Sequence, residues 1–146
     1  MVIKEITYED YNGEKRTESF YFNINETELI DLEMEYPGGL DKYADRVLKE
    51  NDRAKTYKLF KTILFKSYGV KTEDGKYLIK DADKSKMFEC SPAYNELIMS
   101  FLDKPETMLD FIAGIYPKFT EEQKKQLASK KDEVMKELED RHVGVN

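Results

Sequence analysis

The sequence contains few of the residues from which enzyme sites and metal sites are most often built. Its 146 residues include one cysteine, one histidine and no tryptophan. One cysteine excludes a disulfide within the chain, and one cysteine with one histidine excludes a zinc site built only from thiolates and imidazoles. Phosphate-binding loops of the type Gly-x-x-x-x-Gly-Lys or Gly-x-Gly-x-x-Gly are also missing. We therefore expect no cofactor and no metal.

Long apolar runs are missing as well. No stretch approaches the roughly 18 apolar residues that a membrane span requires. The opening Met-Val-Ile-Lys-Glu-Ile carries acid where a secretory signal has an apolar stretch. These patterns predict a protein of the cytoplasm with no membrane partner. The remaining composition, 40% hydrophobic and 12% aromatic, supplies enough apolar material for a folded core.

Charge is abundant and unevenly distributed. The net charge of −6 argues against a nucleic-acid partner, since proteins that bind nucleic acid usually carry excess positive charge. Residues 1–54 hold 7 basic and 14 acidic side chains, whereas residues 55–86 hold 9 lysines and 4 acids. The asymmetry is consistent either with solvated faces or with self-complementary docking, within the chain or between two copies.

The isolated reactive side chains do not form a coherent catalytic pattern. His142 lies in the final segment, where nothing is expected to orient a general base. Cys90, between two expected helices, is interpreted as a small buried thiol. Asp81 and Asp83 match part of a calcium loop but lack its glycine and terminal glutamate, so they are interpreted as charges at a helix N-terminus. A hydrolase with a carboxylate pair stays open as an alternative, because 30 acids always include suggestive spacings.

Two β-hairpins and several helices are predicted from local signals. Asn12-Gly13 and Asp74-Gly75 each separate β-prone segments, as in short hairpin turns. Gly69 is interpreted as a left-handed helix cap and Gly114 as a site of close packing inside a helix. The predicted fold class is α+β, with a mainly helical core of five or six short helices and one or two small antiparallel β-hairpins. Capping residues and apolar periodicity place the helices after Asn25, from about Leu40, over 53–67, over 83–89, from Pro92, and from Pro105 to before Pro117.

The composition changes towards the end of the sequence. We predict one compact α+β domain over residues 1–119, followed by a charged C-terminal helix or appendage over 120–146. Large apolar side chains in that segment form one thin seam, narrower than a core-facing helix requires. The seam residues Leu127, Val134 and Leu138 are the predicted partner-binding residues, and a docked or frayed terminal helix without a role is the alternative.

Composition and motifs together favour a protein-binding function. Eighteen aromatic residues and six methionines suit an interface, since tyrosine is common at interface centres and methionine adapts to irregular grooves. The most specific motif is Tyr68-Gly69-Val70-Lys71 followed by Asp74-Gly75-Lys76. Other motifs are Lys4-Glu5-Ile6-Thr7-Tyr8-Glu9-Asp10-Tyr11-Asn12-Gly13, Phe20-Tyr21-Phe22-Asn23, Ala93-Tyr94-Asn95-Glu96-Leu97 and Phe111-Ile112-Ala113-Gly114-Ile115-Tyr116-Pro117. In these motifs residues 1–117 resemble the tail assembly chaperones of long-tailed phages and prophages of Gram-positive bacteria.

The resemblance implies a small non-enzymatic protein without a cofactor. Such a protein would bind the long, helical, apolar tape measure protein during tail morphogenesis, in the cytoplasm of the host cell, and be absent from the mature virion. The tail tube protein and a second copy of the chain are further candidate partners. The alternative hypothesis is a small phage or host regulator that binds and inhibits a host protein through its acidic surface. That regulator would form a stoichiometric complex with a host protein and leave tail assembly unaffected.

Overall fold

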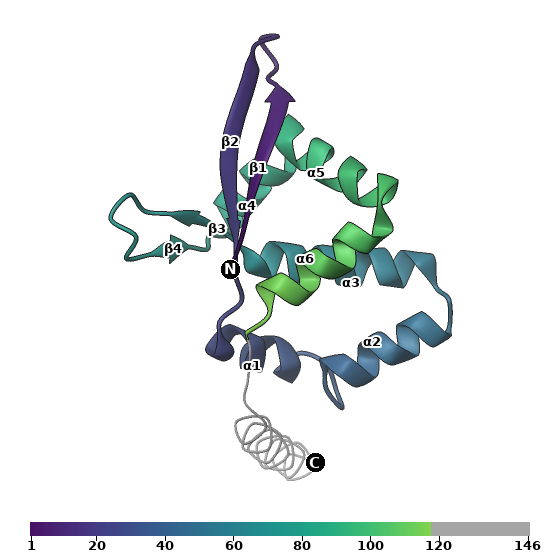
Figure 1. Ribbon diagram of the computed structural model, residues 1–146. Coiled ribbons are helices and arrows are strands. Elements are labelled where there is room, and N and C mark those ends of the chain that lie inside the picture. Colours follow the sequence, from purple (N-terminus) through teal and green to yellow (C-terminus); the bar gives the residue numbers. More distant parts are fainter. Residues whose placement is uncertain (118–146) are drawn as a thin grey trace. The chain divides into compact units, whose positions relative to one another are not determined.

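The computed structural model describes residues 1–117, and these residues form six helices and a four-stranded antiparallel sheet (Figure 1). The fold class is therefore α+β, as the sequence predicts. The chain divides into two compact units: one comprises Met1–Asn25 and Tyr57–Tyr116, and the described part of the other consists mainly of Glu26–Thr56. The single domain over 1–119 stays a prediction. The appendage expected over 120–146 lies outside the described residues.

The long hairpin that the sequence predicts is formed by β1 (Val2–Glu9) and β2 (Lys15–Phe22), which pair over their whole length. In the loop, the amide of Gly13 donates to the carbonyl of Asp10 at 2.9 Å, and Gly13 has a φ of 83°. Glycine adopts this left-handed conformation without steric cost, which explains its place at the end of a short hairpin loop. Of the Asn12-Gly13 pair, only the glycine has a positive φ.

The second predicted hairpin consists of β3 (Tyr68–Lys71) and β4 (Leu78–Ile79), and it joins the first through pairing of β2 with β3. Gly75, in its turn, has a φ of 75°. Gly69, by contrast, lies inside β3 without a positive φ, so the prediction that it caps the preceding helix in a left-handed conformation is wrong. Glycine is required there for space, because a Cβ would lie 2.6 Å from the Cγ atom of Leu78.

The first unit also contains four helices that supply most of its core (Figure 1). They are α4 (Ala82–Glu89), α5 (Pro92–Asp103), α6 (Pro105–Ile115) and most of α3 (Arg53–Ser67). Each helix places at least one aromatic ring in the interior, and these rings pack against each other and against the sheet. The buried aromatic residues of this unit are Phe22, Phe60, Tyr68, Phe88, Phe101 and Phe111.

The second unit contains α1 (Glu26–Met34) and α2 (Leu40–Lys49). The chain turns between them through glycines with positive φ, including Gly38 at 82°. The amide of Leu40 donates to a carboxylate oxygen of Glu33 at 3.0 Å, which satisfies one of the backbone donors left free at a helix start. α2 therefore begins at Leu40, where the sequence predicts the start of a helix.

Candidate partner-binding surface

One face of the sheet carries the helices of the first unit. Val2, Phe22 and Tyr68 lie opposite one another on β1, β2 and β3, so their side chains share this face. The ring of Phe22 packs edge-on against Phe111 of α6, with 5.0 Å between ring centroids. The ring of Phe88 in α4 stacks on Tyr68 at 4.4 Å. This face is therefore the interior side of the sheet.

The opposite face of the sheet carries a row of apolar side chains. Ile3, Tyr21 and Gly69 lie opposite one another on β1, β2 and β3, and the Leu78 side chain fills the space that a Cβ on Gly69 would need. Lys71 lies on the same face, and its Nζ is 5.5 Å from the centre of the Tyr21 ring. Ile3 is 54% exposed. We call Ile3, Tyr21 and Leu78 the outer row; Lys71 lies beside it. Because the water-facing side of an antiparallel sheet is usually polar, the outer row is a candidate binding surface.

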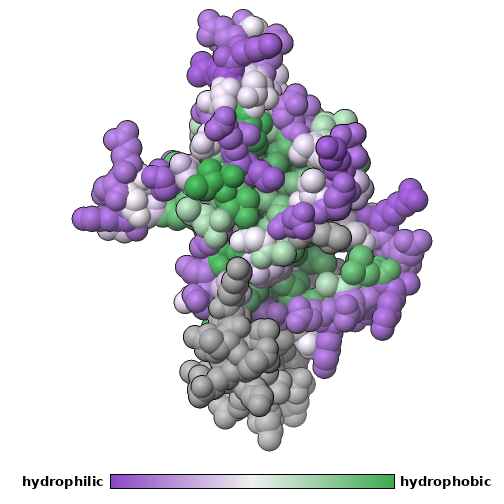
Figure 2. Space-filling view, viewed as in Figure 1, coloured by the Kyte–Doolittle hydropathy of each residue, from purple (hydrophilic) through white to green (hydrophobic). Residues whose placement is uncertain are grey.

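The distribution of polar and apolar surface agrees with a binding site at the base of the hairpins. Figure 2 shows apolar side chains gathered between the lower part of the long hairpin and the β3–β4 hairpin, whereas both hairpin tips are hydrophilic. β3 pairs with β2 only at residues 21 and 22, so the distal part of the long hairpin has no third strand beside it. In this view, the apolar surface beside the hairpins lies near the part of the sheet in which β1, β2 and β3 pair.

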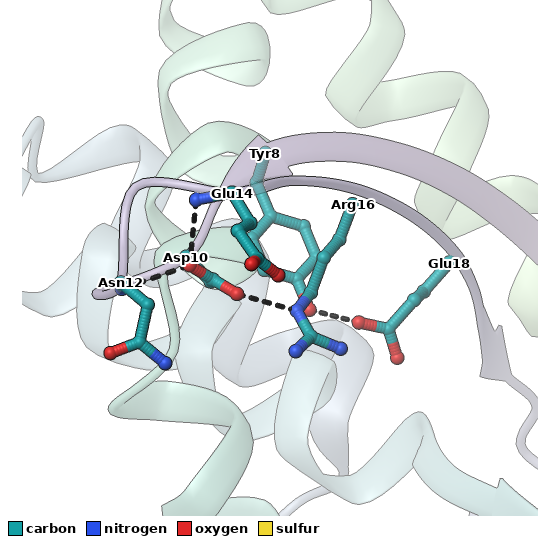
Figure 3. Close-up of polar contacts among 6 residues, drawn as sticks. All are labelled: Tyr8, Asp10, Asn12, Glu14, Arg16 and Glu18. Atoms are coloured by element: carbon teal, nitrogen blue, oxygen red, sulfur yellow. Dashed lines mark hydrogen bonds and ion pairs between the residues drawn. The ribbon is translucent and has the colours of Figure 1, made fainter.

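The tip of the long hairpin is held by a polar network centred on Asp10 (Figure 3). Its carboxylate accepts the amides of Asn12 and Glu14, each at 2.9 Å, and the Nε–H of Arg16 at 2.7 Å. The hydrogen bond from Arg16, followed by the amide of Glu14, holds the pKa of Asp10 below its usual value. The carboxylate thus stabilises the turn as an anion.

A second polar pair lies next to this network (Figure 3). The Tyr8 hydroxyl donates to a carboxylate oxygen of Glu18, and this bond raises the pKa of Tyr8. The hydroxyls of Thr7 and Thr17, directly opposite each other, are 2.9 Å apart. Cross-strand pairs of this kind stabilise an isolated two-stranded ribbon. The tip of the long hairpin is therefore held by polar contacts, whereas Ile6, nearer its base, belongs to the apolar core.

Two lysines of the lysine-rich segment 55–86 form contacts within the first unit. Lys61 of α3 lies between two rings of the same helix, with its Nζ 5.7 Å from the centre of Tyr57 and 6.0 Å from that of Phe65. The same Nζ is 3.6 Å from a carboxylate oxygen of Glu89, which Lys86 also contacts at 3.1 Å. The bond from Lys86 is the main cause of the lowered pKa of Glu89. Part of the positive charge of residues 55–86 is thus neutralised within the chain by Glu89.

Cys90 is exposed, so its interpretation as a buried thiol is wrong. It ends α4, and the next residue, Ser91, begins α5 by accepting the amide of Tyr94 at 3.3 Å. Phe88, two residues earlier, occupies the buried position at this end of α4. The short connection therefore leaves the thiol at the surface.

The structure assigns Asp81 and Asp83 the role that the sequence predicts. Asp81 precedes α4, and its carboxylate accepts the amide of Asp83 at 2.8 Å.

Across residues 1–117, no group of three or more histidine, cysteine, aspartate or glutamate side chains is placed to hold a metal ion. In the same part of the chain, no helix is both long enough and apolar enough to cross a membrane.

The partner-binding residues predicted from the sequence, Leu127, Val134 and Leu138, lie outside the described residues, as does His142. The outer row was not predicted. The sequence feature that could have indicated the outer row is in β1, where the usual placement is reversed. The apolar Ile3 lies on the open face of the sheet and the charged Lys4 lies on the interior face. The Nζ of Lys4 lies 5.9 Å from the centre of the Phe101 ring.

Comparison with known proteins identifies the family. A family model described as phage tail assembly chaperone matches residues 1–143. No curated protein and no solved structure matches the chain. The family match includes both hairpins and all six described helices, and it agrees with the resemblance found in the sequence motifs. The chain therefore belongs to the phage tail assembly chaperone family.

Proposed function

We propose that this tail assembly chaperone binds the tape measure protein while the tail is being built. Binding is reversible and involves neither a cofactor nor catalysis. It takes place in the cytoplasm of the host cell, and the chaperone is absent from the mature virion. The tail tube protein is a second client in this proposal.

The observation that carries the proposal is the apolar outer row on a highly charged protein. A long helical client exposes apolar surface until the tube encloses it, and a chaperone must cover that surface with apolar side chains of its own. Ile3 and Tyr21 offer such side chains on the open face of the sheet. The net charge of −6 would keep the complex dispersed, because like-charged particles repel each other.

The C-terminal seam is a second proposed contact with the client. Leu127, Val134 and Leu138 would form one apolar stripe if the segment is helical, and such a stripe fits a groove in a partner or pairs with a client helix. This proposal concerns residues outside the described range and stands on the sequence pattern alone.

Co-expression with the tape measure protein tests the proposed function. We expect the full chain to increase the soluble fraction of the client severalfold. Loss of the seam through Leu127→Ser, Val134→Ser and Leu138→Ser should remove part of this gain. A matched variant that changes neighbouring charged positions, Lys130→Ser, Glu133→Ser and Glu137→Ser, should keep it.

Two results would count against the proposal. If the full chain leaves the soluble fraction unchanged, it does not act on the tape measure protein. If a chain without 120–146 performs as well as the full chain, the seam has no part in client binding.

A further inference from the structure

We propose that the Asn12-Gly13 pair at the tip of the long hairpin is a site of spontaneous deamidation, at which water converts the Asn12 carboxamide to aspartate and isoaspartate. The inference is independent of the proposed function, because it concerns the chemistry of the chain itself. It also gives the hydrogen bonds around Asp10 a second role, which is to limit the rate of this reaction.

Asn12 is distinguished by its neighbour and by its exposure. Asparagine is among the chemically labile residues, and of the six asparagines in the sequence Asn12 alone is followed by glycine. Deamidation begins when the main-chain nitrogen of the following residue attacks the side-chain carbonyl carbon, and glycine hinders this approach least because it has no Cβ. Asn12 and Gly13 are both exposed to water. Figure 3 shows the Asn12 side chain pointing away from the Asp10 carboxylate.

The reaction needs only the atoms of the turn and water. A bond forms between the Gly13 nitrogen and the Cγ atom of Asn12, and the bond from Cγ to the side-chain nitrogen breaks. That nitrogen takes up the proton of the Gly13 amide and leaves as ammonia, so a five-membered imide ring is formed. Water then adds to one of the two ring carbonyls and opens the ring. Opening at one carbonyl gives aspartate, and opening at the other gives isoaspartate, in which the main chain runs through the former side chain.

The native turn restrains the attacking nitrogen. The amide of Gly13 donates to the main-chain carbonyl of Asp10 at 2.9 Å, so its proton and its direction are both held by this bond. The amide of Asn12 donates to the Asp10 carboxylate, also at 2.9 Å. Both residues of the reacting pair are thus bonded to Asp10. Attack requires the turn to open, so the rate follows the fraction of molecules in which it is open.

Isoaspartate changes the turn more than aspartate does. It adds one carbon atom to the main chain between Glu9 and Lys15, which lie opposite each other as the last pair of the hairpin. The Asp10 carboxylate accepts the amides of Asn12 and Glu14, and a longer main chain moves these two amides relative to each other. Either product also places a second negative charge beside Asp10, and like charges repel. We therefore expect deamidation to loosen the hairpin tip.

Peptide mapping of the full-length chain during warm incubation at mildly alkaline pH measures the reaction. Cleavage by trypsin after Lys4 and Lys15 releases residues 5–15, whose mass rises by the difference between an amide and an acid. The free peptide 5–15 is the unfolded reference, and we expect it to react severalfold faster than Asn12 in the native chain. Asn95 is the internal control, since it is exposed in α5 and followed by glutamate. It should react severalfold more slowly than Asn12 in the same sample.

Two matched variants test the role of the Asp10 contacts. Asp10→Ala removes the carboxylate of the first turn. Asp74→Ala removes a carboxylate of the second turn, which likewise accepts a main-chain amide, that of Lys76 at 3.0 Å. Asp10→Ala should raise the rate at Asn12 severalfold, whereas Asp74→Ala should leave it within twofold of the wild type. Arg16→Gln, which removes one partner of the Asp10 carboxylate, should give an intermediate rate and serves if thermal melting shows that Asp10→Ala does not fold.

Each outcome supports or overturns a stated part of the inference. No product at Asn12 in the native chain, after a time in which the free peptide is converted, would overturn the site. Equal rates in the wild type, Asp10→Ala and Arg16→Gln would show that the contacts of Asp10 do not limit the reaction. Equal acceleration in Asp10→Ala and Asp74→Ala would indicate a general loss of stability and overturn the same role. The peptide of an Asn12→Asp variant marks the aspartate product, and the absence of a second product of equal mass would exclude isoaspartate.

Discussion

Gly114 of α6 lies so close to Val2 of β1 that a Cβ built on the glycine would be 2.7 Å from the Cγ2 atom of the valine. Valine is restricted in χ1, so this methyl group has little freedom to move aside. The start of β1, an edge strand of the sheet, and α6 thus come close together at a residue without a side chain. The sequence-based interpretation that Gly114 marks close packing is confirmed.

This contact predicts the effect of a single methyl group. Gly114→Ala should lower the free energy of unfolding by about 1 kcal/mol, because overpacking costs roughly 1–3 kcal/mol and the gain in helix propensity offsets about 1 kcal/mol. In the double variant, Val2→Ala should restore most of the stability that Gly114→Ala removes, because it makes room for the new methyl group. Urea denaturation of the two single variants and the double variant measures this coupling. A Gly114→Ala protein as stable as the wild type would contradict the close contact.

Neighbouring residues on β2 should differ sharply in their contribution to stability. Phe22 is fully buried against rings from α4 and α6, so Phe22→Ala should cost about 3–5 kcal/mol. Tyr21 lies on the open face, and Tyr21→Ala should cost about 1 kcal/mol or less. Denaturation midpoints measured side by side test the assignment of the two faces, and similar losses at both positions would refute it.

The hairpin tip predicts a specific response to pH. Asp10 has a lowered pKa in the folded chain, so its contribution to stability is complete above the unfolded pKa and is lost as the pH falls through the folded value. Arg16→Gln removes the hydrogen bond that is the main cause of the lowered pKa, so the pKa of Asp10 should rise. The amides of Asn12 and Glu14 remain and still lower it. An NMR titration of the side-chain carboxyl carbon measures the shift. An unchanged pKa in the variant would show that Arg16 does not bond the carboxylate in solution.

The exposure of Cys90 predicts rapid alkylation of the native protein. Iodoacetamide should modify this thiol at a rate close to that of an unfolded control, since no unfolding is required for access. Mass spectrometry of the native protein over time measures the rate. Protection that disappears only in denaturant would restore the interpretation of a buried thiol.

Local signals in the sequence predicted much of the fold, because their physical causes are local. Ser91 followed by Pro92 begins α5, and the hydrogen bond to Tyr94 that confirms it spans only three residues. Gly13 and Gly75 turn the two hairpins with positive φ, as expected of glycine after asparagine or aspartate. Each of these features depends on a few consecutive residues.

The features that the sequence did not predict depend on contacts between distant residues. The role of Gly69 is set by Leu78, nine residues later, so its position at the end of a helical pattern was misleading. The outer row became recognisable only when strand pairing placed Ile3 opposite Tyr21, and Tyr21 opposite the glycine against which Leu78 packs. Strand register across a sheet is decided by tertiary packing and is not written in any one segment.

The most direct test of the central claim is the mass of the purified chain mixed with the tape measure protein, measured by size-exclusion chromatography with light scattering. We expect one species that contains both proteins, with a mass equal to that of the tape measure protein plus a whole number of 17.2 kDa chains. Elution of the two proteins as separate species, each with the mass it has alone, would contradict it.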